Sequence, residues 1–417
     1  MSFITSLTRM WLTRTVQPFT FKNEYDRVLP FAECENLGLY VHIPFCKSIC
    51  NFCPYCKERY SAQLCEEYID SLIQEIHLVG RQHAERKKIT SLYFGGGTPA
   101  LVANRIKEII DALNEHFIIT EGIGLELHPD NVNVEVLQVL KDAGVTKISI
   151  GIQSFCDKYQ KILGRKKIDT LKMKSALAAV PFETISMDFI FALPGQTYDD
   201  LKSDMDTAFS LGANHVAIYP FIDFTFTESP VAAMPKKEKR KLLDAITKHC
   251  LDMGYTRSSI WTFSNEPNAN YSSMTRENFL GFGCSATSLF KEQFKINTFD
   301  VAAYCERIRS GELATSLTIR FTKRQRMIYW LFWTAYSTKV VASEFEKFFG
   351  VPLKKMYGFE LRVAKQLGFI KEHDGIYEMT LKGAFYYHYY ENFYTLSYID
   401  KMWGIMRTEA FPKQIKL

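Results

Sequence analysis

The sequence predicts an α/β protein: a partial (β/α)6 TIM-type barrel followed by a C-terminal winged-helix-like α+β domain. Short β-rich runs alternate with longer helical patterns from residue 37 to about residue 255, and these strands are apolar along nearly their whole length. Parallel strands covered on both faces have this composition. Three helical patterns followed by a hairpin signal near the end of the chain predict the winged helix. Six βα units are fewer than the eight of a closed barrel, so we expect an open one.

Each predicted strand is followed by a predicted helix, which requires right-handed crossovers between parallel strands. The expected strands are 39–44, 91–94, 124–128, 147–152, 184–191 and 215–220. The expected helices are 62–79, 104–116, 134–143, 171–179, 199–211 and 236–253.

Shifts in pattern divide the chain into four parts. We expect an N-terminal arm at 1–36, the partial barrel at 37–255, a barrel-closing extension at 256–318 and the winged-helix-like domain at 319–417. The helices of the last part are expected at 323–335, 340–349 and 353–367. Its hairpin is expected at 369–379, with a two-residue turn at Asp374-Gly375.

Composition excludes several classes of protein. The 417 residues are 47% hydrophobic, which excludes a disordered or collagen-like chain, and the net charge of +5 gives no reason to expect nucleic acid as a partner. No apolar stretch reaches the roughly 18 residues needed to span a bilayer, and the first 20 residues lack the pattern of a signal peptide. Ten cysteines, four of them within residues 46–56, favour metal ligation in a reducing compartment, so we expect a cytoplasmic protein.

A cluster of cysteines follows the first predicted strand directly. Cys46, Cys50 and Cys53 have x3 and x2 spacing, and thiolates in so tight a loop suit an iron–sulfur cluster or zinc. Three protein ligands leave one metal position open, as catalytic sites require. The alternative is a structural zinc site completed by Cys56.

The stretch Tyr40-Val-His-Ile-Pro-Phe-Cys46-x3-Cys50-x-Phe52-Cys53 resembles the radical S-adenosylmethionine (SAM) superfamily, and within it the branch of oxygen-independent coproporphyrinogen III oxidase. The resemblance implies a [4Fe–4S] cluster on the three cysteines, with SAM on the open iron. A low-potential donor such as flavodoxin or ferredoxin would supply the electron that cleaves SAM to a 5′-deoxyadenosyl radical.

The resemblance extends to further positions along the barrel. It implies that the cluster-bound SAM is contacted by Tyr40, Phe52, Gly96, Gly97, Thr98 and Glu126. It implies that a second SAM is contacted by Gln153, Arg165 and Asp188. Asp188 is also informative by itself, because a carboxylate inside an apolar strand is costly to bury without a partner.

The chain departs from the oxidase at several positions. Tyr55 stands where the oxidase has its fourth cysteine, Cys56 comes one place later, and no Tyr-Pro substrate arm precedes the barrel. Residues 264–272 lack the histidine and tryptophan of the heme-chaperone relatives. The combination resembles class C radical SAM methyltransferases, with Tyr55 and Cys56 as candidate catalytic residues. The leading hypothesis is therefore methylation of an sp2 carbon in a planar substrate, a tetrapyrrole or a quinone, with menaquinone favoured.

Two alternatives stay open. The first is oxidative decarboxylation of the coproporphyrinogen oxidase type in heme biosynthesis, and the second is a heme-binding or heme-degrading relative. The preference for a quinone rests on the chain ends: Leu7 and Trp11 with Arg9 and Arg14, and the aromatic tail 385–403, favour peripheral contact with the inner face of a membrane. Ordinary packing of both ends onto the barrel is the alternative to that contact.

Overall fold

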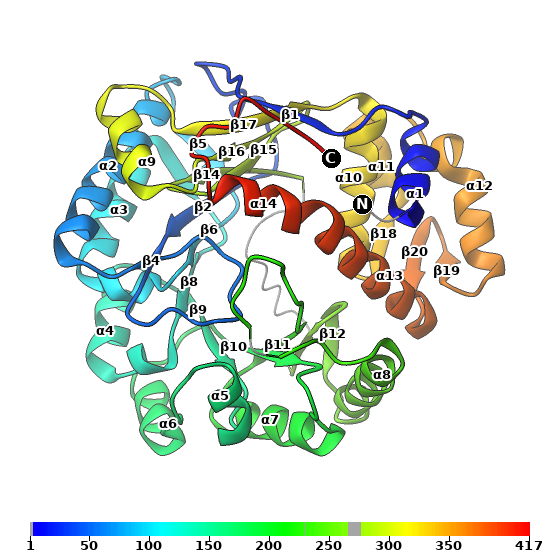
Figure 1. The fold of residues 1–417 in the computed structure, drawn as a ribbon, viewed down its shortest axis with the longest axis horizontal. Coiled ribbons are helices and arrows are strands. Elements are labelled where there is room, and N and C mark those ends of the chain that lie inside the picture. The colour runs from blue at the N-terminus through cyan, green and yellow to red at the C-terminus, as the bar shows by residue number, and fades with distance from the viewer. Residues whose placement is uncertain (1–2, 230, 266–276) are drawn as a thin grey trace.

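Six parallel strands form the centre of the protein, with helices outside them (Figure 1). The structure is a computed structural model that describes residues 3–229, 231–265 and 277–417. In spatial order the central strands are β2 (Leu37–Ile43), β6 (Leu92–Gly96), β8 (Ile123–Leu127), β9 (Lys147–Gln153), β10 (Thr184–Phe191) and β11 (His215–Pro220). All six predicted strands are confirmed to within two residues.

The helices lie in an arc outside these strands (Figure 1). They are α2 (Ala62–Gly80), α3 (Ala103–His116), α4 (Val134–Asp142), α6 (Thr170–Ala179), α7 (Tyr198–Ser210) and α8 (Lys236–Asp252). Each predicted helix is confirmed to within one residue, and a short helix that was not predicted, α5 (Asp157–Ile162), lies between β9 and α6. Because both faces of the strands are covered, β2 and β10 are buried along nearly their whole length.

The sheet continues beyond the six strands at both ends. Beside β2 lie β14 (Asn278–Phe282), β15 (Thr287–Leu289), β16 (Gln293–Asn297), β17 (Thr315–Arg320), β1 (Thr20–Lys22) and β21 (Gln414–Lys416). Beside β11 lie β13 (Thr262–Ser264) and β12 (Thr256–Ser259). Across the described residues the two edge strands, β12 and β21, do not pair with each other, so the barrel is open. The described strands of residues 256–318 lengthen the sheet at both ends, and the expected role of this segment in closing the barrel stays a prediction.

The three-helix and hairpin arrangement follows the main sheet. Its helices are α10 (Lys323–Tyr336), α11 (Ala342–Phe349) and α12 (Leu353–Gln366), and its strands are β18 (Lys339–Val341), β19 (Ile370–His373) and β20 (Ile376–Met379). Asp374 and Gly375 have φ of +50° and +81°, as a type I′ turn requires. The helix predicted at 340–349 begins two residues late, because the β-branched Val340 and Val341 pair with β20.

The aromatic tail returns across the open barrel (Figure 1). It consists of α13 (Leu381–Tyr394), a π-helical turn and α14 (Asp400–Met406), and it leads to β21. Thr225, after β11, donates two hydrogen bonds of 2.8 Å to the Asp400 carboxylate, and Arg407 donates to the Tyr55 carbonyl at 2.9 Å. The tail therefore bridges the last barrel strand and the cysteine loop.

The N-terminal helix α1 (Phe3–Thr13) also packs onto the protein. The Trp11 ring lies 6.1 Å from that of Phe359 on α12, and Arg14 forms an ion pair with Glu360. Within the described part of the chain, no helix is both long and apolar enough to cross a bilayer. Packing accounts for only part of the N-terminal helix, since Leu7 and Trp11 are 45% and 54% exposed, and the expected peripheral membrane contact finds no support.

A buried carboxylate joins α2 to the lengthened sheet. Glu75 accepts hydrogen bonds from the Gly283 amide and the Tyr304 hydroxyl, both at 2.7 Å, and from the Asn297 side chain at 3.0 Å. Lys295 is fully buried nearby, and burial lowers its pKa to about 8 while the negative charge of Glu75 raises it. The turn after β14 thus depends on one side chain of α2.

Replacing Glu75 tests this dependence. We expect Glu75→Ala to lower the free energy of unfolding by about 2–4 kcal/mol, because three buried donors lose their acceptor and Lys295 loses its counter-charge. Urea denaturation followed by circular dichroism measures the change. Glu67→Ala, on the exposed side of the same helix, is the matched control, and equal stability of the two variants would contradict the prediction.

Candidate functional site

A cavity of about 1700 Å³ runs between the barrel and the C-terminal helices. Cys46, Cys50 and Cys53 line one end of it, together with Glu126 and Asp188 from the barrel strands. The tail and α10 line the other end, where Trp403 and Trp333 are among the side chains. The cysteine loop therefore shares one enclosed space with an aromatic chamber.

The three cysteines lie in a loop at the carboxyl end of β2. Lys57 closes this loop by donating to the carbonyls of Cys50 (3.1 Å) and Cys53. The three Sγ atoms do not all lie within 4.8 Å of one another in the described structure. Four thiolates on one zinc ion would lie about 3.8 Å apart, since Zn–S bonds are about 2.3 Å. The wider spacing suits a cluster of several metal ions better than a single ion.

Cys56 does not belong to this set. Its thiol is buried on the far side of the loop, 3.7 Å from the Cys284 Sγ, and it donates to the Phe299 carbonyl at 3.2 Å. It does not line the described cavity, so it neither completes a zinc site with the other three nor reaches a substrate there. The loop turns this thiol into the core, and the expected catalytic role of Cys56 stays a prediction. Tyr55 does line the cavity, with its ring 5.9 Å from that of Trp403.

The glycine turn after β6 lies directly against the cysteine loop. The Gly97 amide donates to the Ile43 carbonyl at 2.8 Å, and a Cβ on Gly97 would lie 2.6 Å from the Phe45 carbonyl oxygen. No side chain fits there, which explains the glycine. Thr98 follows, with its Oγ1 3.8 Å from the Cys46 Sγ. Gly96, Gly97 and Thr98 thus line the cavity beside the thiols, and their contact with SAM stays a prediction.

Two carboxylates lie below the cysteine loop. Glu126 accepts hydrogen bonds from the Gly96 amide (3.2 Å) and the Tyr93 hydroxyl (3.1 Å), and Asp188 accepts from Ser149 (2.8 Å). Burial raises the pKa of Glu126 to about 7, with a further contribution from the charge of Asp188, and burial raises that of Asp188 to about 6. Both groups can therefore exchange a proton near neutral pH.

Arg165 connects the opposite wall to the thiols. Its Nε donates to the Cys50 Sγ at 3.4 Å, its Nη1 donates to the Gly151 carbonyl, and its guanidinium lies 5.6 Å from the centre of the Phe52 ring. Gln153, with a left-handed φ of +70°, lines the same wall. Tyr40 lies nearer the loop, where its hydroxyl is 3.0 Å from the His42 Nδ1.

Sequence reasoning missed two residues of the site, Tyr93 and Lys57. Tyr93 lies between Leu92 and Phe94 in an apolar run, so no polar–apolar alternation marks it in the sequence. No sequence pattern marks Lys57 either, because its hydrogen bonds to the Cys50 and Cys53 carbonyls form only once the loop has folded. Residues 266–276, which include most of the 264–272 segment compared with the heme chaperones, lie outside the described residues.

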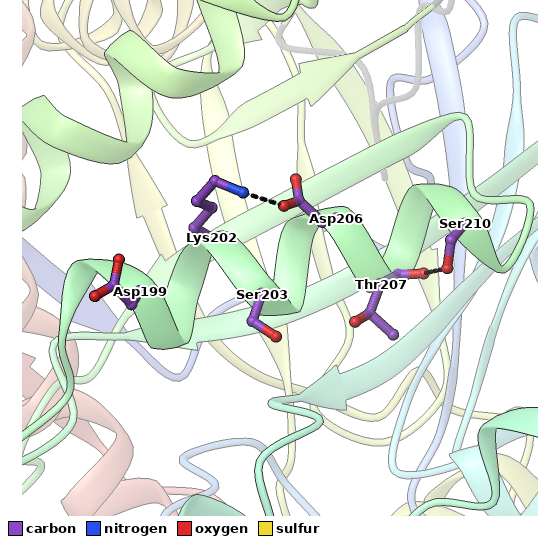
Figure 2. Close-up of a pocket in the computed structure, with 6 residues that line it drawn as sticks. All are labelled: Asp199, Lys202, Ser203, Asp206, Thr207 and Ser210. Carbon is purple, nitrogen blue, oxygen red and sulfur yellow. Dashed lines mark hydrogen bonds and ion pairs between the residues drawn. The ribbon is translucent and has the colours of Figure 1, made fainter.

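A second, shallower depression lies on the outside of the barrel. Figure 2 shows that its side chains form one polar row along α7, in which Lys202 pairs with Asp206 at 2.5 Å. The row is the solvent-exposed side of one helix, and the cavity at the cysteine loop remains the candidate site.

Comparison with known proteins agrees with this location. Residues 40–208 match the Radical SAM superfamily. Residues 40–208 are a radical SAM domain. This domain contains every residue expected to bind the cluster or SAM, from Tyr40 to Asp188.

Two curated relatives and one solved structure extend the similarity. The heme chaperone HemW of Bacillus subtilis is 26% identical over 362 residues, covering 82% of this chain and 95% of that protein. The oxygen-independent coproporphyrinogen III oxidase of Pseudomonas aeruginosa is 25% identical over 315 residues, covering 67% of each. The structure of coproporphyrinogen III oxidase HemN from Escherichia coli has the same fold, with a TM-score of 0.73 at 21% identity over 86% of this chain and 88% of that chain.

These similarities change the leading hypothesis. The chain contains a radical SAM domain and is similar to HemN and HemW, and none of the three relatives is named for methyl transfer or for a quinone. The expectation of a menaquinone methyltransferase therefore finds no support, and the porphyrinogen and heme alternatives agree better with the relatives.

The pKa of Glu126 predicts a pH-dependent stability. Because the folded-state pKa is about 7 against 4.5 in the unfolded chain, the folded protein binds the extra proton between these values. The stability that protonated Glu126 contributes is fully present below pH 4.5 and is lost as pH rises through 7. We therefore expect the free energy of unfolding of SAM-free wild-type protein to fall between pH 5 and pH 8. In Glu126→Gln this fall should be smaller by about 2–3 kcal/mol.

The control for this measurement is Glu135→Gln, which changes an exposed carboxylate on α4. The stability of this control should fall with pH as steeply as that of the wild type. The Glu126 variant should still lose some stability with rising pH, because Asp188 also titrates there. Parallel slopes for wild type and Glu126→Gln would show that burial of Glu126 is not the source.

Proposed function

We propose that this protein is a radical SAM enzyme that acts on a cyclic tetrapyrrole, with oxidative decarboxylation of a porphyrinogen as its reaction. The observation that carries the proposal is the continuity of the cysteine loop with an aromatic chamber large enough for such a substrate. The similarity to a coproporphyrinogen III oxidase over two thirds of the chain supports the same substrate class.

The barrel end of the cavity suits the cofactors of this family. Cys46, Cys50 and Cys53 would hold a [4Fe–4S] cluster, which supplies one-electron cleavage of SAM when it is bound, with a low-potential donor such as flavodoxin or ferredoxin as the electron source. Beside it, the side-chain-free backbone of Gly96 and Gly97 admits a close ligand. Their neighbours Tyr40, Phe52 and Thr98 would complete the SAM pocket.

The carboxylates and the guanidinium would orient the nucleoside. Glu126 offers acceptors for ribose hydroxyls, and Arg165 has the donor geometry that suits a carboxylate. Gln153 and Asp188 continue the lining beyond this point. Small-molecule pockets are typically about 300–1000 Å³, so this larger cavity has room for a second SAM as well as a substrate. The second SAM remains part of the proposal.

The chamber end has the composition expected for a large flat ligand. Among the described residues that line the whole cavity, 24 are Phe, Tyr or Trp and five are Lys or Arg. The tail supplies Tyr387, Tyr390, Tyr394, Tyr398 and Trp403. Aromatic side chains bind planar rings through stacked or edge contacts, and they exclude water from a reactive site.

One acid in the chamber is suited to the inner nitrogens of a tetrapyrrole. The Glu391 Oε1 accepts a hydrogen bond from Thr395 at 3.0 Å, whereas its buried Oε2 has no hydrogen-bond partner among the described residues. Burial raises the pKa of Glu391 to about 7, with the charge of Lys239 lowering it. A pyrrole N–H would supply the missing donor.

Heme is the second candidate substrate, because the cavity carries few cations. Its five lining Lys and Arg residues are opposed by seven Asp and Glu residues, and Arg165 and Lys57 are engaged at the cysteine loop. A porphyrinogen with four propionates would need more positive charge than heme, which has two. The similarity to a heme chaperone over most of the chain points the same way.

Anaerobic turnover distinguishes these reactions. Cluster-reconstituted protein is incubated with dithionite and methyl-labelled SAM, together with coproporphyrinogen III, heme or menaquinone. We expect a tetrapyrrole to stimulate 5′-deoxyadenosine formation without label entering the product. Release of CO2 identifies the oxidase, and loss of the heme spectrum identifies heme breakdown.

The controls separate cluster chemistry from folding. Cys50→Ala should abolish 5′-deoxyadenosine formation and keep the wild-type circular dichroism spectrum, whereas Cys156→Ala, a cysteine outside the cavity lining, should keep activity. Heme binding without any 5′-deoxyadenosine would favour a chaperone, and labelled menaquinone would overturn the proposal.

Glu391 gives a separate test of the chamber. We expect Glu391→Gln to weaken tetrapyrrole binding by about tenfold, because a charge-assisted hydrogen bond to the pyrrole N–H is lost. Fluorescence or absorbance titration measures the dissociation constant. Glu344→Gln, an exposed acid at the rim of the same cavity, is the matched control, and equal affinities would remove Glu391 from the substrate contacts.

A further inference from the structure

A cluster of two histidines and a glutamate lies far from the cysteine loop. His77 is in the last turn of α2, and Glu115 and His116 end α3, which packs beside α2 (Figure 1). Each helix runs from the carboxyl end of one barrel strand back to the amino end of the next. The cluster is therefore at the opposite end of the barrel from Cys46, Cys50 and Cys53, and the proposed function does not use it.

The three ligand atoms converge. The His77 Nδ1 lies 3.0 Å from the His116 Nε2 and 3.8 Å from a carboxylate oxygen of Glu115, and all three atoms lie within 4.8 Å of one another. With metal–nitrogen bonds of about 2.1 Å, two ligands at angles of about 90–110° lie about 3.0–3.4 Å apart. The imidazole pair already has this separation. The Glu115 side chain is 65% exposed, so it can move the remaining fraction of an ångström without disturbing the core.

The backbone of α2 makes room for the His116 ring. A Cβ on Gly80, the last residue of α2, would lie 2.2 Å from the His116 Cγ. Only glycine allows the imidazole to lie flat against the helix end. The ring planes of His77 and His116 are inclined at 78°, with one nitrogen of each ring in the 3.0 Å contact.

The local charges favour a bound cation. Both helices end here, and the carbonyl end of a helix carries a partial negative charge. Glu115 adds a full negative charge, whereas Arg81, directly after α2, opposes it.

We propose that His77, Glu115 and His116 form a binding site for a divalent first-row transition ion of the zinc type. Two imidazoles and one carboxylate suit Zn²⁺ and its neighbours, and a water molecule would fill the fourth position. The ion joins the carbonyl ends of α2 and α3 just before β7 (Phe117–Ile119), which pairs with β5 (Lys87–Ile89). It would thus fasten the first two barrel helices together at the end remote from catalysis.

Zinc titration of the untagged, cluster-loaded protein tests this site. The cluster occupies Cys46, Cys50 and Cys53, so these thiols do not compete for zinc. We expect one Zn²⁺ per chain by elemental analysis after desalting, and a melting temperature raised by a few degrees. His77→Gln should weaken zinc binding at least about tenfold and remove the thermal shift, while 5′-deoxyadenosine formation stays at the wild-type level.

Two further variants make the result decisive. Glu115→Gln leaves the packed His116 ring in place and should lower the affinity for zinc, whereas His373→Gln, a histidine on the distant β19, should not. If wild-type protein retains no more zinc than the His77 variant, the histidine pair is an ordinary hydrogen bond and the proposal is wrong. Zinc binding that all three variants retain would also overturn it.

Discussion

The architecture of the site depends on the close approach of two strand ends. The glycine turn after β6 touches the backbone of the cysteine loop after β2, with the Gly97 amide bonded to the Ile43 carbonyl and no room for a side chain between them. This contact places Thr98 beside Cys46. The Gly96 amide in the same turn donates a hydrogen bond to the Glu126 carboxylate on β8, which fixes Glu126 relative to the turn. Backbone atoms, which cannot change rotamer, thus place the thiols relative to the carboxylate.

The cavity combines two halves of different chemistry. The barrel contributes buried acids and the thiol loop, whereas the C-terminal helices contribute an aromatic chamber. The tail connects the halves, since Asp400 is bound by Thr225 and Arg407 by the carbonyl of Tyr55. The density of aromatic residues in the tail therefore reflects an enclosed chamber, in which tyrosine and tryptophan provide flat apolar surface and a polar edge. A membrane-facing surface would leave these rings outside.

The barrel could be predicted because its signal is local. In Lys147–Gln153 the isoleucines at 148, 150 and 152 are fully buried, and the residues between them, including Ser149 and Gln153, line the cavity. The prediction itself used another local signal, the nearly continuous apolar runs typical of strands that are covered on both faces. The chain ends and the Cys56 thiol could not be predicted in the same way. Cys56 has the right spacing to join its neighbours, and only the turn of the loop into the core shows that it does not.

The sequence by itself determined the alternation of strands and helices, the cysteine loop and the residues expected around it, because hydrophobic period and ligand spacing are properties of neighbouring residues. Only the tertiary structure decided that β14 and β13 lengthen the sheet at opposite ends and that β1 pairs with β21. It also decided that the tail lines the cavity on the side facing the barrel strands. Such contacts join residues hundreds of positions apart. The energies of these contacts depend on shape and burial in three dimensions, so a pattern of neighbouring residues does not predict them.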